Sequence, residues 1–254
     1  MRAFLLVALG LTLTGCFQIV STITVRPDGS ATIEDRVAVS GMGAEALMES
    51  DEPPYDKEAL LARAASLGEG VTLVGVESEG AAYTAFYSVA DVRALRFVPP
   101  DLDLGSNDNA KTVADDNMTV GFDFEPGATS TLRILVENDG MDNAPSEAPA
   151  DTLSEAERAE AARSLGMARA LLGDARMTVD VVVEGDVVGT DAAYVDGSTV
   201  TVFDVRFDAM FDVIEENPEL MGRSEPPTAE ILALVGDREG FRMQPPGSVE
   251  VRFE

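Results

Sequence analysis

Apolar and polar residues alternate from position 17 onward, a pattern typical of a strand with one buried face. The alternation stops at Pro27-Asp28-Gly29-Ser30, where the proline presets φ, the aspartate can bond the backbone ahead and the glycine suits a left-handed conformation. A second alternating run follows, with Ile33, Val37 and Val39 in phase. Residues 17–39 are therefore predicted to form a β-hairpin.

Similar patterns cover most of the remaining chain. Alternation predicts strands at about 71–77, 82–89, 177–183, 199–205 and 249–253, and a second hairpin between 118 and 136. Helical spacing of apolar residues predicts helices at about 55–67 and 152–172, and shorter ones near 207–216 and 227–235. Hairpins interrupted by helices indicate an α+β fold, with an antiparallel β-sheet and a few packed helices.

Residues 137–151 have no apolar periodicity and are acidic and rich in loop-forming residues. We predict a flexible linker there. It would divide the mature α+β domain, residues 16–254, into two lobes.

The N-terminus has the order of a secretory signal peptide. The basic Met1-Arg2 precedes an apolar run, residues 3–13, that is shorter than the roughly 20 residues a transmembrane helix needs. The run closes with Leu13, Thr14, Gly15 and Cys16, which resemble a bacterial lipobox. This resemblance implies that residues 1–15 are removed and that Cys16, the single cysteine, is acylated. The alternative is an ordinary signal peptide followed by an incidental cysteine.

Acylation at Cys16 predicts a lipid-anchored protein of the cell envelope, because two or more acyl chains hold a protein on a membrane. By resemblance to lipoproteins of two-membrane bacteria, an aspartate after the cysteine would favour the inner membrane. Phe17 occupies that position. We therefore expect the outer membrane, at its periplasmic face or at the cell surface.

The composition narrows the range of partners. The net charge is −28, and loss of Arg2 with the signal makes it one unit more negative. Such a charge argues against a nucleic-acid partner, which would need basic clusters, and leaves the acyl anchor to supply the membrane affinity. Either a solvated, salt-tolerant surface or binding of divalent cations explains the acidity.

The chain has no histidine and no tryptophan. Imidazole bases and Ser-His-Asp arrangements are therefore excluded. We expect no cofactor and no enzymatic activity. A carboxylate-based hydrolase is the catalytic alternative, but 46 acidic residues make carboxylate spacing uninformative, and aromatic residues are only 6% of the chain.

Two groups of residues are candidate binding sites. Asp101, Asp103, Asn107 and Asp108 supply clustered oxygen atoms for a weak site for a cation such as Ca²⁺, but a solvated loop is the favoured interpretation. Tyr83, Phe86 and Tyr87 could line an acyl-chain cavity. Alternation instead places Tyr83 and Tyr87 on one face of a strand and Phe86 on the other, as in ordinary core packing.

Three segments together resemble a family of bacterial envelope lipoproteins: the opening hairpin of residues 17–37, the helix-to-strand join at 68–71, and the late block Gly185-Asp186-Val187-Val188-Gly189-Thr190-Asp191-Ala192 with the turn after it. More distantly they resemble the mycobacterial LppM-type domain, which implies an envelope lipid-binding role. Physically, the late block fits turns in which Asp191 bonds nearby amides, or a binding groove.

These observations predict a membrane-anchored lipoprotein with a non-catalytic binding or envelope-organising role. The alternative is a lipid-binding module with an apolar cavity between sheet and helices.

Overall fold

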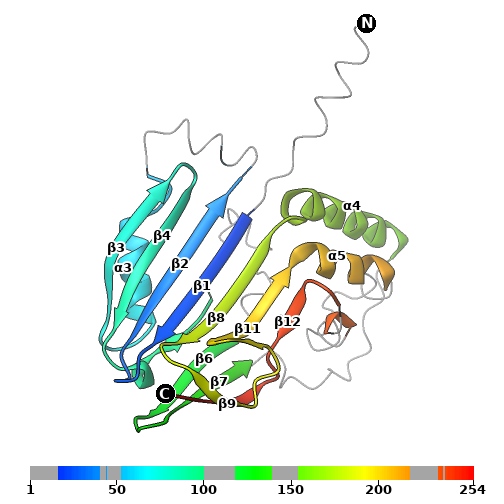
Figure 1. Cartoon of the computed structure of the whole chain (residues 1–254). Helices are drawn as coiled ribbons and strands as arrows, with labels where there is room; N and C mark the ends of the chain where they lie inside the picture. Colours follow the sequence, from blue (N-terminus) through cyan, green and yellow to red (C-terminus); the bar gives the residue numbers. More distant parts are fainter. Residues whose placement is uncertain are drawn as a thin grey trace, which may run out of the picture.

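The computed structural model describes residues 17–40, 44, 53–99, 118–138, 154–217, 234–236 and 238–254. It confirms the α+β fold, with mostly antiparallel strands. The strands form two sheets rather than one. Figure 1 shows the larger sheet, sheet A, in front of the smaller sheet B, which lies behind its lower end.

Sheet A has eight strands in the order β10-β11-β8-β1-β2-β4-β3, with β12 paired to β11. Their bounds are β1 Phe17–Val25, β2 Ala31–Val39, β3 Val71–Glu79, β4 Ala82–Val89, β8 Arg176–Val183, β10 Val195–Asp196, β11 Thr199–Arg206 and β12 Phe241–Met243. The predicted opening hairpin is confirmed, since Ile23 of β1 lies opposite Ile33 of β2. One pairing departs from the expected antiparallel pattern, because β1 and β8 run parallel.

Sheet B has five strands in the order β5-β6-β7-β13-β9. Their bounds are β5 Arg96–Phe97, β6 Met118–Glu125, β7 Ser130–Asn138, β9 Val187–Thr190 and β13 Gly247–Phe253. The second predicted hairpin is β6 and β7. Strand β7 continues to Asn138, so the first two residues of the predicted linker belong to this strand, and residues 139–151 lie outside the described residues.

The helices described over their full length are α3 Lys57–Ser66, α4 Glu155–Leu172, α5 Phe207–Glu216 and the 3₁₀ helix η1 Val92–Ala94. All three α-helices were predicted. Of the helix predicted at 227–235, only residues 234 and 235 are described, and both are helical. None of the helices in the described ranges has the length and apolar content that crossing a bilayer requires.

The two sheets share one hydrophobic core. Alternation places one face of each strand inward, and the inward residues of both sheets form a single cluster. Its largest fully buried side chains include Tyr87, Phe97, Phe122, Phe253 and Ile33. The inward side chains of the two sheets therefore pack against each other in the described part of the chain.

Sheet B packs at the turn end of sheet A, the end formed by Val25, Ala31, Val89 and Val183 in register. Gly29, in the β1–β2 turn, has φ +84°, and an added Cβ would lie 2.8 Å from the Phe124 ring of β6. Glycine is therefore required both for the turn and for the contact. The opposite end of sheet A, the Phe17 end, carries α5, which begins directly after Arg206 of β11.

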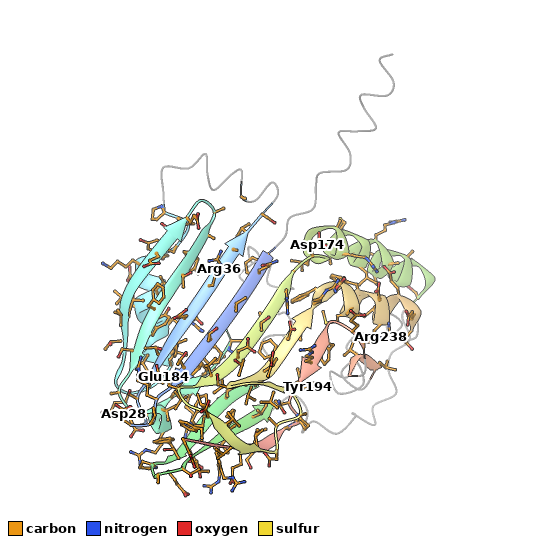
Figure 2. The ribbon with its side chains drawn as sticks, viewed as in Figure 1. Asp28, Arg36, Asp174, Glu184, Tyr194 and Arg238 are labelled. Carbon is orange, nitrogen blue, oxygen red and sulfur yellow. The ribbon has the colours of Figure 1, made fainter. Side chains whose placement is uncertain are left out.

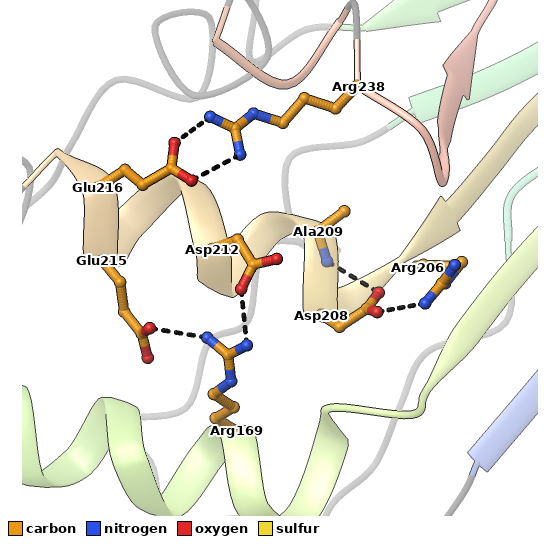
Figure 3. Close-up of polar contacts among 8 residues, drawn as sticks. All are labelled: Arg169, Arg206, Asp208, Ala209, Asp212, Glu215, Glu216 and Arg238. Atoms are coloured by element: carbon orange, nitrogen blue, oxygen red, sulfur yellow. Dashed lines mark hydrogen bonds and ion pairs between the residues drawn. The ribbon is translucent and has the colours of Figure 1, made fainter.

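Helices α4 and α5 pack against each other at the upper right of Figure 1. In Figure 3, Arg169 of α4 reaches two carboxylates of α5, Asp212 at 2.6 Å and Glu215 at 2.8 Å. Glu216 at the end of α5 pairs with Arg238. These contacts hold the helix pair beside β11.

Candidate functional site

An open hollow of about 360 Å³ lies on the outer face of sheet B. Strands β7, β9 and β13 supply its lining, together with the residue after β9. The lining residues are Arg133, Gly189, Thr190, Asp191, Ser248, Glu250 and Arg252. Most of this lining is polar, so the hollow suits a polar ligand rather than an acyl chain.

Register explains why charged residues meet there. Glu250 lies opposite Arg133, and Arg252 lies opposite Gly189, so their side chains emerge on the same face. The Arg133 guanidinium contacts Glu125 at 2.9 Å and Glu250 at 3.5 Å. Its hydrogen bond to Glu125, reinforced by the charges of both glutamates, raises the pKa of Arg133.

Gly189 of β9 forms part of the wall of the hollow. A Cβ at this position would lie 2.6 Å from Nη2 of Arg252, so the guanidinium rests directly over the Gly189 backbone. The Arg252 side chain is half exposed, and its separation from Glu250 is 4.0 Å. The close contact with Gly189, rather than a short ion pair, therefore positions the Arg252 guanidinium, which remains accessible to a ligand.

Asp191 organises the rim of the hollow. The Glu250 N–H donates to Asp191 Oδ1 at 2.7 Å, and the Thr190 hydroxyl donates to the Glu250 carbonyl at 2.8 Å. Asp191 was expected to bond nearby amides, and it instead bonds an amide of β13, far away in sequence. Gly189, Thr190 and Asp191 of the late block also line the hollow.

A second cluster of polar residues lies inside the core, between sheet A and α3. Asp35 of β2 accepts hydrogen bonds from the Ser21 hydroxyl and from Arg63 Nε, both at 2.7 Å. The Asp35 and Arg63 side chains are 3% and 18% exposed. Arg63 also lies over the Phe97 ring, with 5.5 Å to its centroid. The pair locks α3 onto the sheet.

Tyr87 and Tyr83 lie on the same face of β4, as alternation predicted, and this face is the one that carries the buried pair. Burial, and secondarily the negative charge of Asp35, raises the pKa of Tyr87 to about 12. The same two causes raise the pKa of Tyr83. The Tyr87 hydroxyl and Arg63 Nη2 are buried without a hydrogen-bond partner in the described structure. Tyr87 is fully buried in the core, and Tyr83 is partly buried against it.

Two aspartates on the outer face of sheet A bear on the hydrolase alternative. Asp204 receives two 2.7 Å hydrogen bonds from Arg176, and these lower its pKa against the opposing effect of burial. Burial raises the pKa of Asp180. Divergent pKa values suit an acid and a base. However, neither residue lines the hollow, and Asp204 is held by Arg176.

Several predicted residues cannot be placed. Leu13, Thr14, Gly15 and Cys16 lie outside the described residues, and so do Asp101, Asp103, Asn107 and Asp108. Within the described ranges, no three acidic residues are grouped closely enough to hold a metal ion.

A groove at the late block was one alternative from the sequence, but the contribution of β7 and β13 to the hollow was not predicted. Apolar and polar residues alternate along β7 and β13, and the polar positions include Arg133, Glu250 and Arg252. This alternation is the sequence signal that their side chains reach solvent. Their grouping depends on the pairing of β13 with β7 and β9.

No family model and no curated protein matches this chain. Among solved structures, it is similar to the NMR structure of the folded domain of LppM from Mycobacterium tuberculosis, at 10% sequence identity. The match covers 94% of this chain and 89% of that chain, with a TM-score of 0.30. A TM-score this low transfers neither fold nor function.

Proposed function

We propose that this protein is an exported, lipid-anchored binding protein of the cell envelope, and that the hollow on sheet B is its binding site. The observation that carries the proposal is the sequence Leu13-Thr14-Gly15-Cys16, which closes a short apolar run and leads directly into the first strand at Phe17. An acylated Cys16 explains the single cysteine of an exported chain.

The chemistry of the hollow supports a polar ligand that bears an anionic group. Arg252 offers a half-exposed guanidinium, whose fork of donors matches carboxylate and phosphate oxygens. The carboxylates of Asp191 and Glu250 line the hollow beside it and are acceptors for donor groups of a ligand. A lipid-binding module would instead need an apolar cavity. Among the described residues, the inward side chains of both sheets pack together in one hydrophobic cluster. We therefore favour a protein that binds a polar ligand and does not catalyse a reaction.

The anchor is tested by Cys16→Ser in the native host, with Thr72→Ser, an exposed position on β3, as the matched control. We expect the serine variant to accumulate with its signal uncleaved and without acyl chains, whereas the control is cleaved, remains membrane-bound and carries acyl chains by mass spectrometry. A bare thiol at Cys16 in the mature wild-type protein contradicts the proposal.

The binding site is tested by cross-linking capture from detergent-solubilised envelope. Wild type is compared with Arg252→Gln and with Arg93→Gln, which removes one exposed arginine away from the hollow. Components that bind at the hollow should disappear for Arg252→Gln and persist for Arg93→Gln. If both variants capture the same set as wild type, the hollow is not the binding site.

A further inference from the structure

The two ends of the hollow on sheet B differ in charge. Arg252 lies opposite Gly189, and its guanidinium rests over the Gly189 backbone. Glu250 and Asp191 stand together in the neighbouring outward row, because the Asp191 N–H donates to the Glu250 carbonyl at 3.3 Å. The two rows are two residues apart along the strands, a distance of about 7 Å. The hollow therefore has one basic end and one acidic end.

The charged groups at both ends retain hydrogen-bonding capacity. The Glu250 carboxylate lies 3.5 Å from Arg133 and 4.0 Å from Arg252, whereas a charge-assisted hydrogen bond is about 2.7–2.9 Å long. The short contact of Arg133, at 2.9 Å, goes to Glu125 of β6 instead. Asp191 uses Oδ1 for the Glu250 N–H, which leaves Oδ2 as an acceptor for a ligand.

The surroundings of the hollow are acidic. The other charged residues that register places on the outer face of sheet B, or at its end beside β9, are Arg96, Asp123, Glu125, Glu137, Asp186 and Glu254. Glu184 lies at the end of sheet A opposite the start of β1 (Figure 2), where it pairs with Arg26 at 3.3 Å. Five carboxylates against one guanidinium, on a protein of net charge −28, repel a ligand that is only anionic. A ligand that is only cationic would meet the positive charge of Arg252.

We propose that the hollow binds a short zwitterionic peptide, with its ammonium group beside Asp191 and Glu250 and its carboxylate on the Arg252 guanidinium. This inference deepens the proposed function of the hollow and rests on it. Such a ligand has no net charge, so the acidic surface does not repel it, and each of its ends meets an opposite charge. The fork of donors on Arg252 matches a carboxylate, and the two acidic side chains accept the donors of an ammonium group.

The spacing of the two ends sets the length of the ligand. Two residues of extended peptide span about 7 Å, which matches the separation of the two rows. A free amino acid carries both of its charges on one Cα and is too short to reach both ends. Strand β9 is also the edge strand of sheet B, so the open side of its backbone has no strand partner among the described elements and is available to a peptide amide. A dipeptide with free ends is therefore the smallest peptide that fits.

The test measures binding of dialanine to the full acylated protein in detergent by isothermal titration calorimetry. N-acetyl-dialanine lacks the ammonium group, dialanine amide lacks the carboxylate, and alanine keeps both charges at a shorter spacing. Glycerophosphoethanolamine is a zwitterion without a peptide bond. We expect dialanine to bind, and the capped and shortened forms to bind about tenfold more weakly, because each loses a hydrogen bond to a charged group.

Variants assign each end of the ligand. In Glu250→Gln the loss caused by N-acetylation should shrink, and in Arg252→Gln the loss caused by amidation should shrink. Glu79→Gln on β3 and Arg93→Gln remove the same charges at exposed positions away from the hollow, and they should leave both losses unchanged. A Tm equal to that of wild type verifies that each variant is folded.

Capped peptides that bind as tightly as dialanine, or capping losses that are equal in all four variants, overturn the inference. Tighter binding of glycerophosphoethanolamine than of dialanine also overturns it, and assigns the hollow to a lipid head group. If no peptide binds, the inference is refuted, and capture with Arg252→Gln decides separately whether the hollow is a binding site. Capture that depends on Arg252 then leaves the proposed function intact, whereas capture that does not depend on Arg252 refutes both.

Discussion

The buried Asp35–Arg63 pair makes the most demanding prediction about stability. Replacing Arg63 with methionine keeps a long side chain against Phe97 but removes the partner of a carboxylate that is only 3% exposed. An unpaired buried charge costs about 3–5 kcal/mol. Because Arg63 is 18% exposed, some solvent compensates, and we expect a loss of about 3 kcal/mol.

For a chain of this size, that loss corresponds to a decrease in Tm of about 6–12 °C. The assay is urea unfolding followed by circular dichroism, supported by thermal scans. The matched control is Arg93→Met, which breaks the exposed pair with Asp91 and should leave the free energy of unfolding unchanged within error.

A double-mutant cycle identifies the cause of the loss. If the buried charge is responsible, Asp35→Asn combined with Arg63→Met should be less destabilised than the sum of the two single variants. Additive losses, or an Arg63→Met protein within about 1 kcal/mol of wild type, would refute the reasoning that this carboxylate is desolvated.

Two further predictions concern single residues. The pKa of Tyr87 is about 12 in the folded protein and about 10 when unfolded, so the protein should lose stability as the pH rises from about 10 to about 12. Tyr87→Phe should flatten this loss in alkaline unfolding curves, and Tyr194→Phe is the control. An unchanged slope for Tyr87→Phe argues against the assignment. Gly166→Ala in α4 should stabilise the protein by about 0.5–1 kcal/mol in thermal unfolding, since nothing lies within 4 Å of the added Cβ, and a loss of stability would show that this glycine has another role.

The hairpins could be predicted because their determinants are local. Asp28 accepts a 2.9 Å hydrogen bond from the Ser30 N–H, and Gly29 adopts positive φ, as the turn sequence indicated. The parallel pairing of β1 with β8 could not be predicted, because alternation specifies which face of a strand is buried but not which strand lies beside it. For the same reason, the sequence predicted one sheet where the structure has two.

The candidate site was less predictable than the fold. Asp35 stands in phase with Ile33 and Val37, which indicates a buried carboxylate, but its partner comes from a helix elsewhere in the sequence. The hollow combines residues of three strands through long-range register. The close contact of Gly189 with Arg252 likewise appears only in the structure.

The parallel pairing of β1 and β8 also constrains how the protein matures. Neighbours β2, β4 and β3 can assemble on β1 early, because they follow within the first 89 residues. The other edge of β1 must wait for β8, which ends at Val183. Until then the nascent protein has an unsatisfied strand edge, a template for unwanted pairing with other chains. The nascent chain therefore carries a half-built sheet until β8 is available, which makes incomplete chains prone to aggregation.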